Sequence, residues 1–71
     1  MDLEPERFLA LDEALEKLAK EDPRAAEVTR LRFLAGLSVE ETALALGISE
    51  RSVFREWTYA RARLVDLIGD A

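Results

Sequence analysis

The chain has 71 residues, of which 49% are hydrophobic and 35% are charged, and its formal net charge is −5. This is the composition of a folded domain rather than of a disordered segment, and the length permits only one small domain. Cysteine and histidine are both absent, which excludes disulfides and removes the commonest metal ligands and the commonest general base. We therefore expect no cofactor. The apolar runs are too short to span a membrane and the acidic start is unlike a secretory signal, so the sequence predicts a cytoplasmic protein.

The first part of the chain predicts one amphipathic helix after a short lead-in. Residues 1–7 are polar and include Pro5, which is typical of a frayed terminus. Apolar side chains then recur at helical spacing: Phe8, Leu11, Leu15 and Leu18. This helix is expected to stop near residues 20–21, and the folded domain is expected to cover residues 8–69.

Asp22 and Pro23 predict the start of a second helix. Asp accepts hydrogen bonds from the free N–H groups of a first helical turn, and Pro suits the first helical position. Gly36 stands where a C-terminal cap is expected. The apolar positions of this helix are Ala26, Val28, Leu31, Phe33 and Leu34.

A third, short helix is predicted over about residues 38–46. Ser38 and Glu41 have the spacing of a capping box, in which each side chain binds a backbone N–H near the other residue. The apolar residues inside this helix are Ala43, Leu44 and Leu46.

The last helix is predicted from residue 50 to about residue 68. Gly47 can adopt the turn conformation that a Cβ would oppose, and Ser49 caps the helix that follows. No segment alternates with period two, so no strand is expected. The sequence therefore predicts an all-α fold of four helices, with a C-terminal helix-turn-helix.

Positive charge is concentrated in this last helix. Residues 51–63 carry four arginines against one acid, Glu56, for a local charge of +3, whereas the other residues carry −8. An acidic body repels nucleic acid at long range, and four arginines offer few phosphate contacts. Any DNA binding by the isolated chain is therefore expected to be weak and sensitive to salt.

On a helical wheel of about 100° per residue, the last helix has two faces. One face is apolar and consists of Val53, Trp57, Ala60, Leu64 and Leu67. Roughly opposite lie Arg51, Arg55, Thr58 and Ala62, with Ser52 and Tyr59 at the edge. Arginine reads guanine bidentately in the major groove, so Arg51 and Arg55 are candidate base readers. Ser52, Thr58 and Tyr59 are candidates for further DNA contacts. The alternative is a solvated face on which the arginines pair with neighbouring glutamates.

An enzyme is not expected. Paired carboxylates such as Glu40 and Glu41 diverge by about 100° around a helix, so they do not face one substrate. The serines have no histidine to activate them, and the sequence has no glycine-rich phosphate loop.

Several blocks of the sequence resemble region 4 of bacterial sigma factors, most closely the extracytoplasmic-function type. The blocks are LDEAL at 11–15, DPR at 22–24, LRF at 31–33, LSVEETALALGIS at 37–49, VFREW at 53–57 and ARA at 60–62. The resemblance covers about residues 8–67, and the blocks occur in the family's order and at its distances.

The resemblance implies a domain that recognises the minus-35 element of double-stranded promoter DNA with its last helix. It also implies that the first three helices hold the flap-tip helix of the RNA polymerase β subunit. Carried over by position, the base readers are Arg51, Ser52 and Arg55, and Glu41 and Thr42 lie near the phosphate backbone. The core and the flap groove together are expected to include Leu11, Leu15, Leu18, Leu31 and Leu34. The promoter-melting domain of sigma factors has no counterpart in these residues, so a fragment or a stand-alone relative is expected.

Phe54 departs from this pattern, because the group usually carries a basic or polar residue at that position. Leu44 and Ala45 also make the third helix unusually apolar. These residues fit either packing or a partner-binding patch, and Phe54 is assigned to the latter. The alternative function is therefore a protein-interaction module that binds polymerase, an anti-sigma factor or itself, with little DNA affinity. If the domain recognises promoter DNA, it is expected to be a monomer in isolation and to depend on tethering to polymerase for its promoter affinity.

Overall fold

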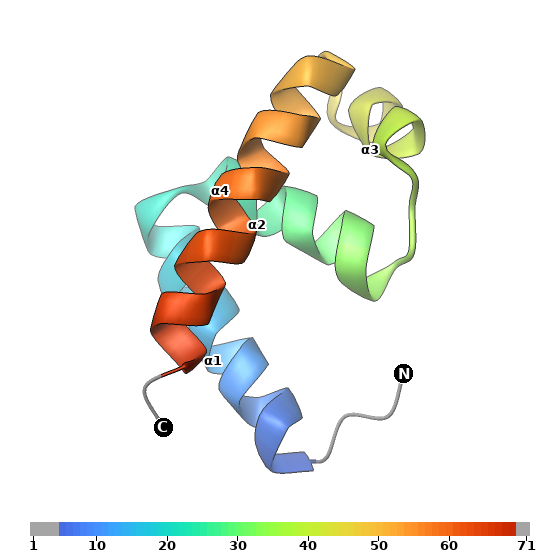
Figure 1. Ribbon diagram of the computed structural model, residues 1–71. Coiled ribbons are helices and arrows are strands. Elements are labelled where there is room, and N and C mark those ends of the chain that lie inside the picture. The colour runs from blue at the N-terminus through green and yellow to red at the C-terminus, as the bar shows by residue number, and fades with distance from the viewer. Residues whose placement is uncertain (1–4, 70–71) are drawn as a thin grey trace.

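The computed structural model describes residues 5–69, which form four α-helices and one π-helical segment (Figure 1). In chain order these are α1 (Pro5–Glu21), α2 (Pro23–Thr29), η1 (Arg30–Leu34), α3 (Val39–Leu46) and α4 (Glu50–Ile68). No strand occurs within residues 5–69, so the prediction of an all-α fold is confirmed. None of these helices has the length and apolar character that crossing a membrane requires.

α1 begins earlier than the sequence predicted. Its first residue is Pro5 rather than Phe8, so residues 5–7 belong to the helix and not to a lead-in. Proline fits this position because the first helical N–H has no intrahelical acceptor in any case. The remainder of the predicted lead-in, residues 1–4, lies outside the described residues.

The junction between α1 and α2 is a single residue. The N–H of Asp22 donates to the Leu18 carbonyl oxygen at 2.7 Å, which completes the end of α1. The carboxylate of Asp22 accepts a hydrogen bond from the Ala25 N–H at 3.1 Å, which caps α2. The backbone of Asp22 therefore ends the first helix, and its side chain starts the second, which is the role that the sequence predicted.

The larger core cluster joins α1, α2 and the C-terminal half of α4, which lies beside α1 in Figure 1. Leu15 and Leu18 are its large buried side chains. Alanines make up much of this cluster, and Ala25, Ala26 and Ala60 are fully buried. A methyl side chain lets two helix backbones approach closely, which explains why so small a chain can pack three helices together.

The smaller core cluster holds the helix-turn-helix together. Val28 of α2, Ala43 of α3 and Val53 of α4 are buried against one another. The partly buried side chains around them are Val39, Leu46, Ile48 and Trp57. Val28 and Val53 are both completely buried. Through Val53, the N-terminal half of α4 is therefore packed against α2 and α3.

The π-helical segment η1 was not predicted from the sequence. The Ala35 N–H donates to the carbonyl oxygen of Arg30, five residues earlier, instead of four as in an α-helix. Gly36 then adopts φ 73°, in the left-handed region, and turns the chain toward α3. Gly36 thus follows the end of the second helix as predicted, but the last turn of that helix is wider.

Candidate nucleic-acid interface

The first helix of the helix-turn-helix, α3, begins with the predicted capping box. The Glu41 N–H donates to the Ser38 hydroxyl at 3.0 Å, and the Ser38 N–H donates to the Glu41 carboxylate at 2.8 Å. The hydrogen bonds from Ser38 lower the pKa of Glu41, because they stabilise its ionised form. Glu41 is therefore a charged acceptor engaged with its own helix terminus.

The turn between α3 and α4 positions the start of α4. Gly47 has φ 67°, in the left-handed region that favours glycine. The Ile48 N–H donates to the Ala43 carbonyl oxygen at 3.1 Å, which closes the turn. The Ser49 hydroxyl accepts from the Ser52 N–H at 3.0 Å and donates to the Ser52 hydroxyl at 2.9 Å. The cap and turn predicted at these positions are both present.

The face of α4 that points away from the core carries most of the predicted DNA-binding residues. Arg51, Arg55 and Thr58 are exposed, and Tyr59 is 43% exposed at the edge. These side chains, together with that of Phe54, line one open depression. The Thr58 hydroxyl donates to the Phe54 carbonyl oxygen at 2.9 Å. The structure therefore brings together five residues with cationic, polar and aromatic side chains on one helix face.

The four arginines of the basic segment are not equivalent. Within the described part of the chain, Arg51 and Arg55 form no ion pair. The alternative in which they pair with neighbouring glutamates is therefore not what the structure contains. Arg61, in contrast, lies over the ring of Trp57, with its guanidinium carbon 5.6 Å from the ring centroid. Among residues 5–69, the arginines on the exposed face of α4 that lack an ion pair are Arg51 and Arg55.

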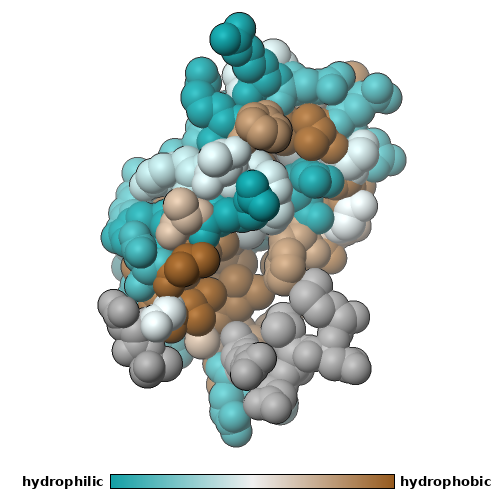
Figure 2. All heavy atoms as spheres, in the orientation of Figure 1, coloured by the Kyte–Doolittle hydropathy of each residue, from teal (hydrophilic) through white to brown (hydrophobic). Residues whose placement is uncertain are grey.

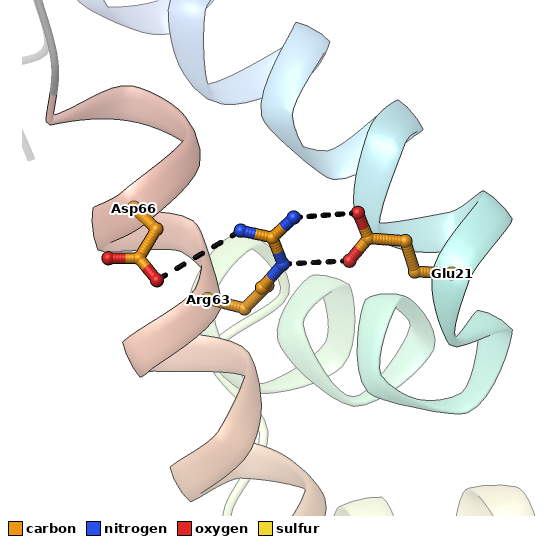
Figure 3. A network of polar contacts seen from close by, with 3 residues as sticks. All are labelled: Glu21, Arg63 and Asp66. Atoms are coloured by element: carbon orange, nitrogen blue, oxygen red, sulfur yellow. Dashed lines mark hydrogen bonds and ion pairs between the residues drawn. The ribbon is translucent and has the colours of Figure 1, made fainter.

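Arg63 is also engaged within the domain (Figure 3). Its Nε and Nη2 donate to the two carboxylate oxygens of Glu21 at 2.8 Å each, which ties α4 to the end of α1. Asp66, on the same helix, lies 4.0 Å from Nη1. The hydrogen bonds from Arg63 lower the pKa of Glu21. This arginine is a structural residue and does not add to a DNA-binding surface.

Trp57 is half-buried and packs on the smaller core cluster, as predicted for a residue of the apolar stripe. Arg32 of η1 also lies over the Trp57 ring, and its guanidinium carbon is 5.6 Å from the ring centroid. Nη1 of Arg32 donates to the Leu37 carbonyl oxygen, so the same arginine fixes the loop that leads to α3. Trp57 therefore links η1, the loop and α4 rather than offering a stacking platform for bases.

Glu56 is the one acid of the basic segment. It is half-buried beside Asp22, the residue that caps α2. Desolvation raises the pKa of Glu56, and the hydrogen bond and charge of Asp22 raise it further. Arg55 and Arg24 act in the opposite direction but less strongly. The pKa of Glu56 is therefore set mainly by desolvation and by Asp22, with a smaller opposing effect of Arg55 and Arg24.

Two of the predicted phosphate-contacting residues do not fit that role. Thr42 is completely buried and its hydroxyl oxygen has no hydrogen-bond partner within the described residues, so its side chain cannot contact a phosphate. Its position one turn into α3, facing the core, explains the error. Glu41 is exposed, but its carboxylate is engaged with Ser38 and would repel a phosphate. Ser52 is half-buried at the cap of α4, with its hydroxyl bound to Ser49.

The predicted partner-binding leucines separate into different environments. Leu15 and Leu18 are buried in the larger core cluster, so they cannot contact a partner. Leu34 is 49% exposed, and Leu31 lines an open depression with Ala45 and Leu46. Leu11 lines a different groove, which we call the apolar groove.

The apolar groove is lined by residues of α1, α2, η1 and α4. It has a volume of about 300 Å³ and is lined by Leu11, Thr29, Phe33, Trp57, Arg61, Leu64 and Val65. Figure 2 shows hydrophobic side chains gathered around the C-terminal half of α4, next to α1. The sequence assigned Phe33 to the apolar face of the second helix and gave no role to Val65, which is 68% exposed. The sequence could have drawn attention to Val65, because it is an apolar residue that lies outside the apolar face predicted for the last helix.

A model of the ECF sigma factor family matches residues 2–69, which is nearly the whole chain. No curated protein and no solved structure gives a significant match. The match agrees with the fold, with the capped helix-turn-helix and with the exposed arginines of α4. The family is one of transcription factors rather than enzymes, and its partners are RNA polymerase and promoter DNA. This chain therefore belongs to the ECF sigma factor family, whose role is promoter recognition in transcription.

Proposed function

We propose that this domain recognises the minus-35 promoter element by placing the N-terminal half of α4 in the major groove. The observation that carries the proposal is the pair Arg51 and Arg55, which lie one turn apart, are exposed and form no ion pair with any described residue. A recognition helix needs donors on the outer face of its N-terminal half, and arginine is the best bidentate partner of guanine. Thr58 and Tyr59 then supply contacts to phosphates or base edges.

The test compares Arg55→Ala with Arg55→Lys and with Lys17→Ala. Loss of a bidentate contact to guanine is expected to weaken binding by about 1–3 kcal/mol, a factor of roughly 5–150. Arg55→Lys keeps the charge but loses the planar guanidinium that can donate two parallel hydrogen bonds, so it should recover little of the lost affinity. Lys17 is an exposed cation on α1, far from α4 in sequence, and its removal controls for net charge.

The assay measures binding to minus-35 duplexes at low salt, and thermal unfolding confirms that each variant folds. Equal losses in Lys17→Ala and Arg55→Ala would contradict specific recognition by α4. A lowered melting temperature with unchanged DNA binding in Arg55→Ala would make this residue structural. Binding by the isolated domain is expected to fall steeply as salt rises, because most of its surface is acidic.

We also propose that the apolar groove receives the flap-tip helix of the polymerase β subunit. An amphipathic helix docks by laying its apolar face into such a groove. The groove has an almost wholly apolar lining, and Val65 on its rim is 68% exposed. Val65→Glu should abolish binding of a β-flap peptide, whereas Leu44→Glu, at a 78% exposed site on α3, should not. Equal binding by both variants would refute this docking site.

A second candidate function is a protein-interaction module with little DNA affinity of its own. The net charge of −5 and the apolar groove favour it. An amide NMR titration separates the two candidates. Shifts confined to about residues 49–59 on adding minus-35 duplexes support DNA recognition. Shifts only with the flap peptide or an anti-sigma factor support the interaction module.

A further inference from the structure

We propose that Phe54 is a specificity-determining residue that contacts the 5-methyl group of a thymine next to the base pairs read by the arginines. This inference rests on the proposed function and names one base feature that the domain selects. It replaces the sequence-based expectation that Phe54 belongs to a partner-binding patch.

The position of Phe54 supports a contact outside the domain. The side chain is 63% exposed and belongs to neither core cluster. Burial of a phenylalanine contributes strongly to stability, so a largely exposed one does little for this fold. Phe54 lies three residues after Arg51 and four before Thr58, so the three side chains follow one row of the helix surface.

The surroundings of Phe54 favour DNA over a protein partner. The depression that it lines is completed by Arg51, Arg55, Thr58 and Tyr59, so the aromatic ring is framed mostly by cationic and polar groups. The apolar groove, where a protein partner is proposed to dock, is lined by other residues. In Figure 2, the few hydrophobic side chains near the N-terminal end of α4 are surrounded by hydrophilic ones, while a larger hydrophobic group lies at its C-terminal half. A duplex complements the charges around Phe54.

The chemistry of the major groove then limits what Phe54 can read. A phenyl ring neither donates nor accepts conventional hydrogen bonds, so it cannot bind the polar base edges. The apolar feature that unmodified B-DNA displays there is the methyl group of thymine. Along a helix axis, Phe54 stands about 4.5 Å from Arg51, which is close to the roughly 3.4 Å rise of one base pair. The selected thymine is therefore expected within about one or two base pairs of a guanine that an arginine reads.

The experiment first selects binding sites for the 71-residue chain from a randomised duplex pool at low salt. Each thymine of the selected site is then replaced by uracil, which removes only the methyl group. We expect one position at which the wild-type affinity falls about fourfold, the factor that corresponds to burial of one methyl group. Phe54→Ala should bind the thymine and uracil duplexes equally. Leu44→Ala, which removes another exposed apolar side chain, should discriminate like the wild type.

The outcomes separate this inference from the proposed function. Failure to select any duplex would refute DNA recognition by the isolated chain, and this inference with it. Sequence-specific binding without a thymine–uracil difference at any position would overturn the role of Phe54 alone. Discrimination that persists in Phe54→Ala would also overturn it. A Phe54→Ala variant that loses discrimination, with its melting temperature unchanged, would establish the contact.

Discussion

Replacement of Gly47 by alanine tests how much the left-handed turn between α3 and α4 contributes to stability. Gly47 has φ 67°, and a Cβ built at this position meets no atom within 4 Å. A steric clash is therefore absent, and the whole cost of the substitution comes from backbone conformation. The left-handed conformation costs a residue with a Cβ roughly 1–2 kcal/mol, and part of this is offset because alanine restricts the unfolded chain. The expected net loss in the free energy of unfolding is about 1 kcal/mol.

A loss of this size should lower the melting temperature by about 4–8 °C for a domain of this length. Circular dichroism during heating and urea titration measure it. Gly47→Asn should cost less than Gly47→Ala, because asparagine tolerates the left-handed region. Gly36→Ala is a matched control, since Gly36 has φ 73° and equally open surroundings. Its cost should be similar.

A loss well above 2 kcal/mol in Gly47→Ala would refute this reasoning, because it would require a steric contact that the structure lacks. An unchanged stability would also refute it, since the turn would then not need the left-handed conformation. Duplex binding by the folded variant should remain near the wild-type level, because the core cluster around Val53 still orients α4.

Three further predictions concern the core and two carboxylates. Leu18→Ala leaves a cavity at a fully buried site and should lower the free energy of unfolding, measured by urea titration, by about 2–5 kcal/mol. A domain of this length is expected to have a free energy of unfolding of roughly 4–11 kcal/mol, so the loss is large. Arg63→Ala should lower the melting temperature at pH 7, and the difference should shrink as the pH falls below 4.5. The reason is that the lowered pKa of Glu21 gives stability that is lost as Glu21 becomes protonated. Glu56→Gln should raise the melting temperature at pH 7, because the pKa of Glu56 beside Asp22 is raised and its ionised form is disfavoured. This gain should vanish below pH 4.5, where the wild-type carboxyl is protonated in both states.

Helix caps were the part of the fold that local sequence determined best. Caps act through hydrogen bonds between residues about three positions apart, so their chemistry can be read directly from the sequence. Asp22, Ser38 and Ser49 each cap the helix predicted for them, and Gly47 takes the left-handed turn. The exposed face of α4 was equally predictable, because helical periodicity alone separates Arg51 and Arg55 from the apolar stripe.

Only the tertiary structure decided how residues with similar patterns divide between roles. The pairing of Arg63 with Glu21 joins residues 42 positions apart, so no local signal distinguishes this arginine from Arg55. The sequence also does not distinguish Leu18 from Leu11, because both lie on one apolar face of α1. In the structure Leu18 is buried, whereas Leu11 lines the apolar groove. Packing between helices settles such questions, since it depends on which surfaces meet when all four helices assemble. Composition, caps and periodicity thus determined an all-α domain with a basic outer face on its last helix. The contacts between helices determined which cations and apolar side chains remain available to a partner.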